Sequence, residues 1–561
     1  MPAQSLAPTI RLGTARGLLP DLAAGGTAAA LAGAVTVLAI VAALAIPAVS
    51  VGRGGGDLVA ALDGGYRMMR GLVPHVDFAV PHGAWPLVEG WLALRLEPWA
   101  VPFVTYQVAN WLTVLPGVLV LAARQRGPLA AAGVVAFAAC ATLLPFVVEL
   151  EKASEFAYYA GYNRLTTALL FLVVVWAVRP ARRGWGEAIL VAYLLLALAA
   201  TKVTGLMAGG AVVLASGMLS SPRRRVVVRA ALVAALAVAL LQAATGVPLA
   251  YLRDVLDMVA INRGGGGFLL GLTGLRALPA CLVLALLAWA LVRRRASLAA
   301  GLSRPLALAR AERPAVLVTV VAATTLFAES QNNGSLGLAA TAALLLMPLA
   351  GPAVPALRAA LAVAVLAPWL GSAAIRGTTH LTGPFREARP DPAVERLLPG
   401  AVPTRQQAEM ADDYRRLWHL GEQRIGGRAS TLLAEAGKPL EAALFVAVAR
   451  TVDEAARAAL ARGDVGPDSR VMTLNHIDWF ARVLGARPVP GTNLWHDPAR
   501  TFAPPVSGYR HYLRAADAVF HGLCATDVAS DREFAPFLPA LEADFARRPL
   551  TECWEVWLRR R

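Results

Sequence analysis

The stretch GGGDLVAALDGGYRMMRGLVPHVDFAVPHGAWPLVEGWLALRL, residues 54–96, carries four acidic residues and two histidines. It lies between the first two long apolar segments of a protein that has only 37 acidic residues among 561. Prolines divide it into two helical patches, 58–69 and 85–94, because a proline cannot continue a helix. We expect these patches to lie along a membrane surface and the loop to be the functional part of a membrane protein.

The composition places this loop in a polytopic membrane protein. Hydrophobic residues make up 57% of the chain and recur in long runs, a balance that no soluble globular class has. The net charge of +16 would favour a nucleic-acid partner in a soluble protein. Here the arginines gather in short segments between the apolar runs, which is typical of cytoplasmic loops, so we expect no nucleic acid as partner.

The apolar segments predict about eleven transmembrane helices. A basic start puts the N-terminus in the cytoplasm, arginine clusters then follow even-numbered spans, and acidic segments follow odd-numbered spans. This alternation predicts that the C-terminal tail lies outside the cytoplasm, although one miscounted short span would move it to the other side. The predicted spans are 27–50, 99–122, 128–148, 165–178, 188–200, 206–219, 230–245, 278–292, 315–328, 336–349 and 357–370.

The predicted fold class is therefore a polytopic α-helical membrane protein with a C-terminal soluble α/β domain. Residues 1–375 form the transmembrane domain, with the first outward loop at 50–98, and residues 376–561 form the extracytoplasmic domain. We expect several crossings of the cell inner (plasma) membrane. In the tail, apolar runs predict strands, and an alanine-rich charged stretch predicts a helix. The expected strands are 443–449, 469–475, 516–522 and 554–560, and the helix is 451–463.

Four cysteines are too few for a disulfide framework. Cys140 and Cys281 lie in apolar segments and are expected to be packing residues. Cys524 and Cys553 lie in the polar tail and can pair if the tail is outside the cytoplasm, a point that the sequence leaves open.

The acids of the first loop are the candidates for catalysis, because ionisable groups near a bilayer need a partner or a water-filled cavity. Asp57 follows the first span closely, and Asp77 stands between two prolines that fix the loop. A partly buried carboxylate can act as a general base near neutral pH. The alternatives are a solvated helix end for Asp57 and a turn-capping side chain for Asp77, while Asp63 is expected to be a turn or cap residue.

Two histidines of the same loop, His75 and His82, are candidates for binding substrate. With Asp57 and Asp77 they could hold a metal ion, but their spacing matches no metal signature, and hydrogen-bonded structural histidines are the alternative. No cofactor is certain from the sequence, and a divalent cation (Mg²⁺ or Mn²⁺) is left open.

Later segments on the same predicted side of the membrane add polar candidates. Tyr162 and Arg164 are suited to stack on a sugar and to hold a phosphate, or they belong to an interfacial aromatic belt. Lys202, in a tight turn between two spans, suits a lipid-linked phosphate, or it is an interface lysine that snorkels.

A further set of candidates lies beyond residue 260. Arg263, before a run of glycines, is a second phosphate candidate, with a snorkelling or solvated side chain as the alternative. Gln331 and Asn332 fit sugar hydroxyls, with a hairpin turn as the alternative. The chain has no GxxxxGK[ST] motif, which argues against an ATP-driven pump but not against a donor whose phosphate is attached to a lipid.

The first loop as a whole resembles the GT-C superfamily of membrane glycosyltransferases, which take sugars from polyprenyl phosphates. The resemblance consists of an acid after the first span, then a G-x-x-P-[YH]-x-D-F element, then a helix rich in aromatic residues and proline. The matching residues are Asp57, Gly71, Pro74, His75, Asp77, Phe78, Gly83 and Pro86. Segment 158–164 and the motifs TKVTG and QNN look like later outward elements of bacterial mannosyl- and arabinosyl-type transferases, so the resemblance covers residues 20–372.

The resemblance implies a hexosyl- or pentosyltransferase. Its donor would be a polyprenyl-phosphate sugar held in membrane lipid, and its acceptor an envelope glycan, lipid or protein. The catalytic base of the family falls on Asp57, and its second acid falls on Asp77. Leu58 follows Asp57 where many members have another acid, which leaves the base and metal roles open.

Two other classes of function remain as alternatives. A transporter or flippase of lipid-linked glycans would need charges deep inside its helices and an inverted repeat, whereas this chain has few such charges and no visible repeat. A non-catalytic membrane scaffold would use its tail to bind a partner. In an enzyme Asp57 and Asp77 should converge on one cavity, and in a scaffold they should point apart.

Overall fold

The computed structural model describes the chain in several continuous ranges and at scattered single positions between them. The ranges are 18–51, 55–125, 127–144, 161–179, 184–261, 388–418, 440–496, 508–524 and 534–560. The predicted spans 278–292, 336–349 and 357–370 lie outside the described residues, as does the predicted domain boundary at 375, and the span 315–328 is described only at a few positions.

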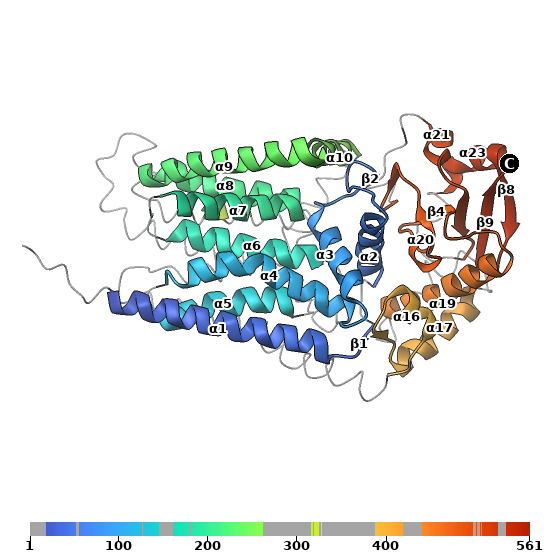
Figure 1. Ribbon diagram of the computed structural model, residues 1–561, viewed down its shortest axis with the longest axis horizontal. Helices are drawn as coiled ribbons and strands as arrows, with labels where there is room; N and C mark the ends of the chain where they lie inside the picture. The colour runs from blue at the N-terminus through green and yellow to red at the C-terminus, as the bar shows by residue number, and fades with distance from the viewer. Residues whose placement is uncertain are drawn as a thin grey trace, which may run out of the picture.

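Long apolar helices form a bundle in which they lie side by side (Figure 1). These helices are α1 (Leu18–Ala45), α4 (Pro102–Ala122), α5 (Pro128–Leu143), α6 (Gly161–Val178), α7 (Trp185–Thr201), α8 (Val203–Leu219) and α9 (Ser221–Thr245). Within the described part, 4 helices are long and apolar enough to cross a membrane, and α5, α7 and α8 are shorter apolar helices. Every predicted span up to residue 245 coincides with one of the bundle helices, while the total of about eleven stays a prediction.

The bundle has an inside and an outside. The most apolar stretch of α6 is 89% buried, whereas the corresponding stretches of α1 and α9 are 22% and 11% buried. Polar side chains fasten the helices to one another: Trp111 Nε1 donates to Thr36 Oγ1 (2.9 Å) between α4 and α1. Exposed leucines and valines along α1 and α9 are then the surface expected to face lipid.

The first loop forms two helices at one end of the bundle, as expected from its prolines. Helix α2 spans Gly55–Met69 and helix α3 spans Trp85–Leu96, which confirms the two predicted helical patches. Between them lie the short strand β2 (Phe78–Ala79) and two turns. The two helices cross at glycines: a Cβ atom built on Gly65 would lie 2.4 Å from the backbone nitrogen of Trp91, and one on Gly90 would lie 2.2 Å from the carbonyl oxygen of Ala61.

This close crossing predicts a stability effect. Gly65→Ala should lower the free energy of unfolding by about 1–3 kcal/mol, because the new methyl group forces α2 away from α3. Gly56→Ala in the same helix is the matched control, since its Cβ would meet only Ile477 Cδ1 at 3.6 Å, an ordinary contact. Thermal unfolding of the detergent-solubilised variants measures both. Equal melting temperatures for the two variants would show that the crossing tolerates a methyl group.

The C-terminal region contains a five-stranded mixed sheet in the order β5-β4-β7-β9-β8. Strands β4 (Arg470–Leu474), β7 (Ala518–Gly522) and β9 (Trp554–Arg559) confirm three of the predicted strands. The other two are β5 (Arg487–Pro488) and β8 (Phe545–Pro549), and β8 and β9 are antiparallel. The helices in this region are α16 (Pro392–Leu397), α17 (Arg405–Trp418), α19 (Leu440–Ala461), α20 (Phe480–Val483), α21 (Tyr509–Leu513) and α23 (Leu538–Asp544), with a 3₁₀ turn at Ala535–Phe537.

The predicted strand at 443–449 is wrong, because these residues lie inside α19. A short, wholly apolar run has no period that separates a buried strand from a buried helix. Here the run continues directly into the charged helical stretch 451–463, and together they form one helix whose apolar face is buried in the core of the region.

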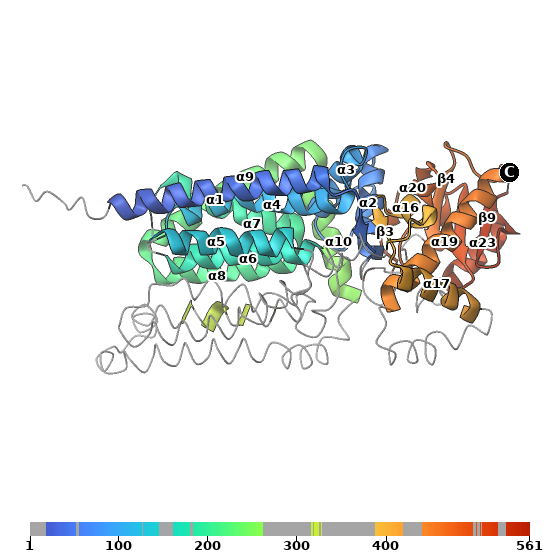
Figure 2. The ribbon, with the colours of Figure 1, turned by 90° about the horizontal axis from the view of Figure 1, so that it is seen from below.

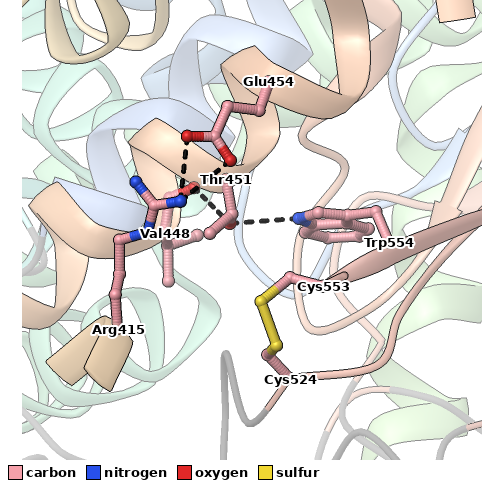
Figure 3. The surroundings of a disulfide bond; sticks show 7 residues. All are labelled: Arg415, Val448, Thr451, Glu454, Cys524, Cys553 and Trp554. Atoms are coloured by element: carbon pink, nitrogen blue, oxygen red, sulfur yellow. Dashed lines mark hydrogen bonds and ion pairs between the residues drawn. A yellow bond between two sulfur atoms is a disulfide. The ribbon is translucent and has the colours of Figure 1, made fainter. Parts of the chain in front are cut away.

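A disulfide joins Cys524 to Cys553 and ties the segment after β7 to the start of β9 (Figure 3). Beside it, Trp554 Nε1 donates to Thr451 Oγ1 (3.1 Å) on α19. Such bridges persist in oxidising compartments and are rare in the cytosol. Cys140 is a free cysteine, as expected, and Cys281 lies outside the described residues.

The C-terminal region is docked onto the first loop at the end of the bundle, as the two views in Figures 1 and 2 agree. Strand β1 (Val49–Ser50) pairs with β3 (Ala401–Val402), and β2 pairs with β6 (Thr492–Asn493), both in parallel. One buried apolar cluster contains side chains of α2 together with side chains of α19 and the sheet. The loop and the C-terminal region therefore share a hydrophobic core.

An ion-pair network lies inside this junction. Arg67 of α2 donates from Nε to Asp63 (2.8 Å) and from Nη2 to Asp478 (2.8 Å), and it donates from Nη1 to Thr492 Oγ1 (3.0 Å). The side chains of Arg67 and Asp63 are each 1% exposed. The expectation that Asp63 caps a turn is wrong, because Asp63 sits within α2 and its carboxylate serves Arg67.

Candidate active site

A pocket lies where the first loop, the bundle and the C-terminal region meet. About 350 Å³ of space in and in front of it is free of protein atoms, open solvent included. Each of the three parts of the protein contributes to its wall. The loop supplies Asp57, Leu58, Ala61, His82 and Pro86, the bundle supplies Phe103, Tyr106, Gln107, Gly161 and Tyr162, and the C-terminal region supplies Trp495.

Asp57 is the carboxylate of this wall. It occupies the first turn of α2, directly after the first membrane helix and the short strand β1. The N-terminal end of a helix carries a partial positive charge, which stabilises an ionised carboxylate there. The aromatic rings of the bundle and of Trp495 stand around the same cavity, so the site combines one acid with apolar walls.

His82 is a neutral member of the site. Its Nδ1 lies 2.8 Å from the carbonyl oxygen of Gly83, so Nδ1 carries the hydrogen and Nε2 is left as an acceptor. Burial is the main cause that lowers the pKa of His82 to about 4. Its ring lies 4.9 Å from that of Tyr162 and meets Trp495 edge to face at 5.4 Å. At neutral pH His82 can accept a hydrogen bond but cannot act as a cation for phosphate.

Lys202 lies beside the pocket on its bundle side, and burial lowers the pKa of its amino group to about 7. Gly83 N donates to the carbonyl oxygen of Thr201 (3.1 Å), which brings the turn between α7 and α8 against the first loop. Lys202 Nζ donates to Asn163 Oδ1 (2.9 Å) and lies 5.4 Å from the ring centre of Tyr162. Because Tyr162 lines the pocket, the ammonium group stands behind one of its walls.

Asp77 and His75 have other contacts and are not among the residues that line the pocket. Asp77 accepts a hydrogen bond from Val73 N (2.7 Å) and so closes the turn in which it lies. His75, with a left-handed φ of 67°, places Nδ1 2.7 Å from Asp254 of α10 (Val247–Ile261). The convergence of Asp57 and Asp77 on one cavity, which was expected for an enzyme, is thus not observed, so this criterion favours the scaffold, and the acid of the cavity is Asp57.

Arg164 stands behind the pocket wall. Its Nη1 donates to the carbonyl oxygen of Leu144 (2.6 Å). With the amide of Gln107 turned so that its oxygen faces Arg164 Nη2, the two lie 2.7 Å apart. Arg164 therefore positions Gln107, which lines the pocket. Arg263, Gln331 and Asn332 lie outside the described residues.

A divalent cation finds a poor set of ligands in this pocket. Its wall offers the carboxylate of Asp57 and the Nε2 atom of His82, whereas Mg²⁺ and Mn²⁺ prefer several oxygen ligands. No group of three or more His, Cys, Asp or Glu side chains suited to a metal occurs among the described residues. The described residues of the pocket do not fit a resident metal ion, and no step below is routed through one.

Several residues of the site were missed in the sequence. Trp495 reaches the pocket only because β6 pairs with β2, and no local sequence pattern predicts that pairing. Gln107 had a usable signal, since a polar side chain within a predicted span is a candidate for function. Tyr106 and Phe103 are ordinary residues for the end of a span, and their role follows from the geometry alone.

Comparison with known proteins adds nothing to this geometry. No model of a protein family, no curated protein and no solved structure matches the chain. The functional argument therefore depends on the site itself.

Proposed function

We propose that this protein is a membrane glycosyltransferase of the GT-C kind, which moves a sugar from a polyprenyl-phosphate donor to an extracytoplasmic acceptor. The observation that carries the proposal is the pocket at the end of the bundle, where one carboxylate, Asp57, lies among aromatic rings. Aromatic faces suit the apolar faces of sugar rings, and Lys202, which a donor phosphate nearby would keep protonated, lies beside the wall nearest the membrane helices.

The chemistry follows from the places of these groups. Asp57 takes the proton from an acceptor hydroxyl, whose oxygen then forms a bond to the anomeric carbon of the donor sugar. The bond from that carbon to the phosphate oxygen breaks, and the phosphate leaves with the electron pair. The donor enters with its lipid in the bilayer, so its phosphate lies on the bundle side of the pocket. Lys202 lies on that side and stabilises the negative charge of the departing phosphate. His82 Nε2 accepts a hydrogen bond from a sugar hydroxyl.

The orientation that this chemistry needs has independent support. The first loop and the C-terminal region share a core, so they lie on the same side of the membrane, and the number of crossings between them is even. An odd total agrees with the predicted number of about eleven spans. The disulfide between Cys524 and Cys553 favours an oxidising compartment for that side. A cytoplasmic N-terminus and an extracytoplasmic C-terminal domain in the plasma membrane satisfy both observations.

The test uses the full-length protein in lipid nanodiscs with radiolabelled polyprenyl-phosphate mannose and polyprenyl-phosphate arabinose. The proposal expects label to leave the polyprenyl carrier and to appear on an added glycoside or lipid acceptor. A flippase would instead move the intact labelled lipid between the leaflets of a liposome. Label that changes leaflet and stays on its carrier would replace the proposal by that function.

Lys202 provides a separate prediction within this proposal. Lys202→Met should raise the KM for the donor by about 10- to 100-fold, because a hydrogen bond to a charged phosphate is worth about 1.5–3 kcal/mol. Lys202→Arg keeps the charge and should retain part of the affinity. Steady-state kinetics with varied donor concentration measure both variants. A donor KM unchanged in Lys202→Met would remove Lys202 from phosphate binding.

A further inference from the structure

Trp495 is the residue through which the C-terminal region enters the pocket wall. The pairing of β6 with β2 carries it there, and Leu494 N donates to the carbonyl oxygen of Ala79 (2.9 Å) just before it. The indole is only 9% exposed. His82 meets it edge to face at 5.4 Å, and His476 stacks near it at 6.4 Å, so two rings fix its orientation.

The indole N–H of Trp495 is buried and has no hydrogen-bond partner among the described residues. Five other indoles in the described ranges have a partner for this group, whereas the indole of Trp479, like that of Trp495, has none. Trp85 donates to Thr113, Trp111 to Thr36, Trp176 to Glu187, Trp554 to Thr451 and Trp557 to Glu555. A buried donor without a partner destabilises a protein, and Trp495, unlike Trp479, lines the pocket, so a ligand in the pocket is the candidate acceptor for its N–H.

We infer that Trp495 forms the acceptor subsite of this pocket: its indole packs on a neutral sugar ring of the acceptor and donates its N–H to a hydroxyl or ring oxygen. This inference rests on the proposed glycosyltransferase function. It gives the C-terminal region a direct part in choosing the substrate. It also favours a glycan or glycolipid as the acceptor, because the face of an indole suits the apolar face of a sugar ring.

The assignment to the acceptor, and not to the donor, follows from the two sides of the pocket. The donor arrives from the bilayer with its phosphate toward the bundle, where Lys202 stands beside Tyr162. In an inverting displacement the attacking oxygen enters opposite the leaving phosphate. Trp495 belongs to the wall supplied by the C-terminal region, which covers the end of the bundle, so a ring packed on it would approach from outside the membrane.

The test measures binding without needing turnover. The full-length protein in nanodiscs is titrated with methyl α-mannopyranoside and methyl α-arabinofuranoside, and saturation-transfer NMR reports the dissociation constant of each. Trp495→Phe keeps a ring but removes the N–H, and we expect it to raise the dissociation constant of the more tightly bound glycoside by about 3- to 10-fold. Trp495→Ala removes the ring as well and should weaken binding of the same glycoside by at least about 30-fold, the loss typical of a hot-spot tryptophan.

Trp479→Phe is the matched control. Trp479 lies in the same region of the chain, is also buried, and also has an indole N–H without a described partner, yet it does not line the pocket. Its substitution should leave glycoside binding unchanged. Equal affinities for Trp495→Phe and the unmodified protein, an equal loss in Trp479→Phe, or no binding of either glycoside to the unmodified protein would each overturn the inference. Failure of the proposed function would show separately, as absence of label transfer from the polyprenyl carrier.

Discussion

Asp57→Asn should lower the kcat of sugar transfer by about 10²- to 10⁴-fold, the usual contribution of a general base. The amide has nearly the shape of the carboxylate but cannot take the proton of the acceptor hydroxyl. Because Asp57 lies in the first turn of α2 and in the pocket wall, the substitution should leave the packing of the helix intact. Donor KM should therefore change by only a few-fold, and the loss should appear in kcat when transfer of radiolabel is followed at saturating donor.

Asp77→Asn is the matched control, because it changes the other acid that the resemblance marked as catalytic. The carboxylate of Asp77 accepts from Val73 N in its own turn, and an asparagine oxygen can make the same hydrogen bond. Transfer by this variant should stay close to that of the unmodified protein. If instead Asp77→Asn lost activity and Asp57→Asn kept it, the base would be Asp77 and the pocket assignment would fail.

The parts of the fold that depend on local composition could be predicted from the sequence. The apolar segments up to residue 245 match described helices, and the prolines of the first loop lie between α2 and α3 and in the first turn of α3. The strand predicted at 516–522 is visible because it is a short apolar run between turns, and the observed strand β7 (Ala518–Gly522) is buried throughout. The run at 443–449 is likewise short and apolar but belongs to α19. Only its continuation into a helical stretch distinguishes it from a strand.

The site was predictable only in part, because half of it is built by contacts between distant segments. Asp57 and His82 could be named from the first loop, and Lys202 from its position in a turn between spans. Trp495 comes from the C-terminal region and meets the loop through strand pairing, and Asp478 of the same region meets it through its ion pair with Arg67. Asp63 looked like a turn residue because two glycines follow it, and its ion pair required a partner across the junction.

Arg67→Met should be the most destabilising single substitution in the junction, with a loss of about 3–5 kcal/mol, the usual result of breaking a buried ion pair. It leaves the carboxylates of Asp63 and Asp478 buried without their shared cation. We expect the C-terminal region to detach from α2, with a lower melting temperature and faster hydrogen exchange at β2 and β6. Arg70→Met, which removes an exposed arginine of the same loop, is the control and should cost little.

The pH dependence of this loss separates the electrostatic cause from a simple loss of packing. Burial, together with the charge of Asp63, raises the pKa of Asp478 to about 6, and Arg67 opposes that rise. A carboxyl whose folded pKa lies above its unfolded value stabilises the protein at low pH and loses that contribution as pH rises through the folded pKa. Without Arg67 the pKa of Asp478 should rise further, so the loss of stability in Arg67→Met should be larger at pH 8 than at pH 5.

The triple variant Asp63→Asn, Arg67→Met, Asp478→Asn carries no charge at these three positions and should recover much of the stability. A deficit that is the same at both pH values, and that the triple variant does not reduce, would mean that Arg67 acts through the packing of its side chain against Phe78 and not through its charge.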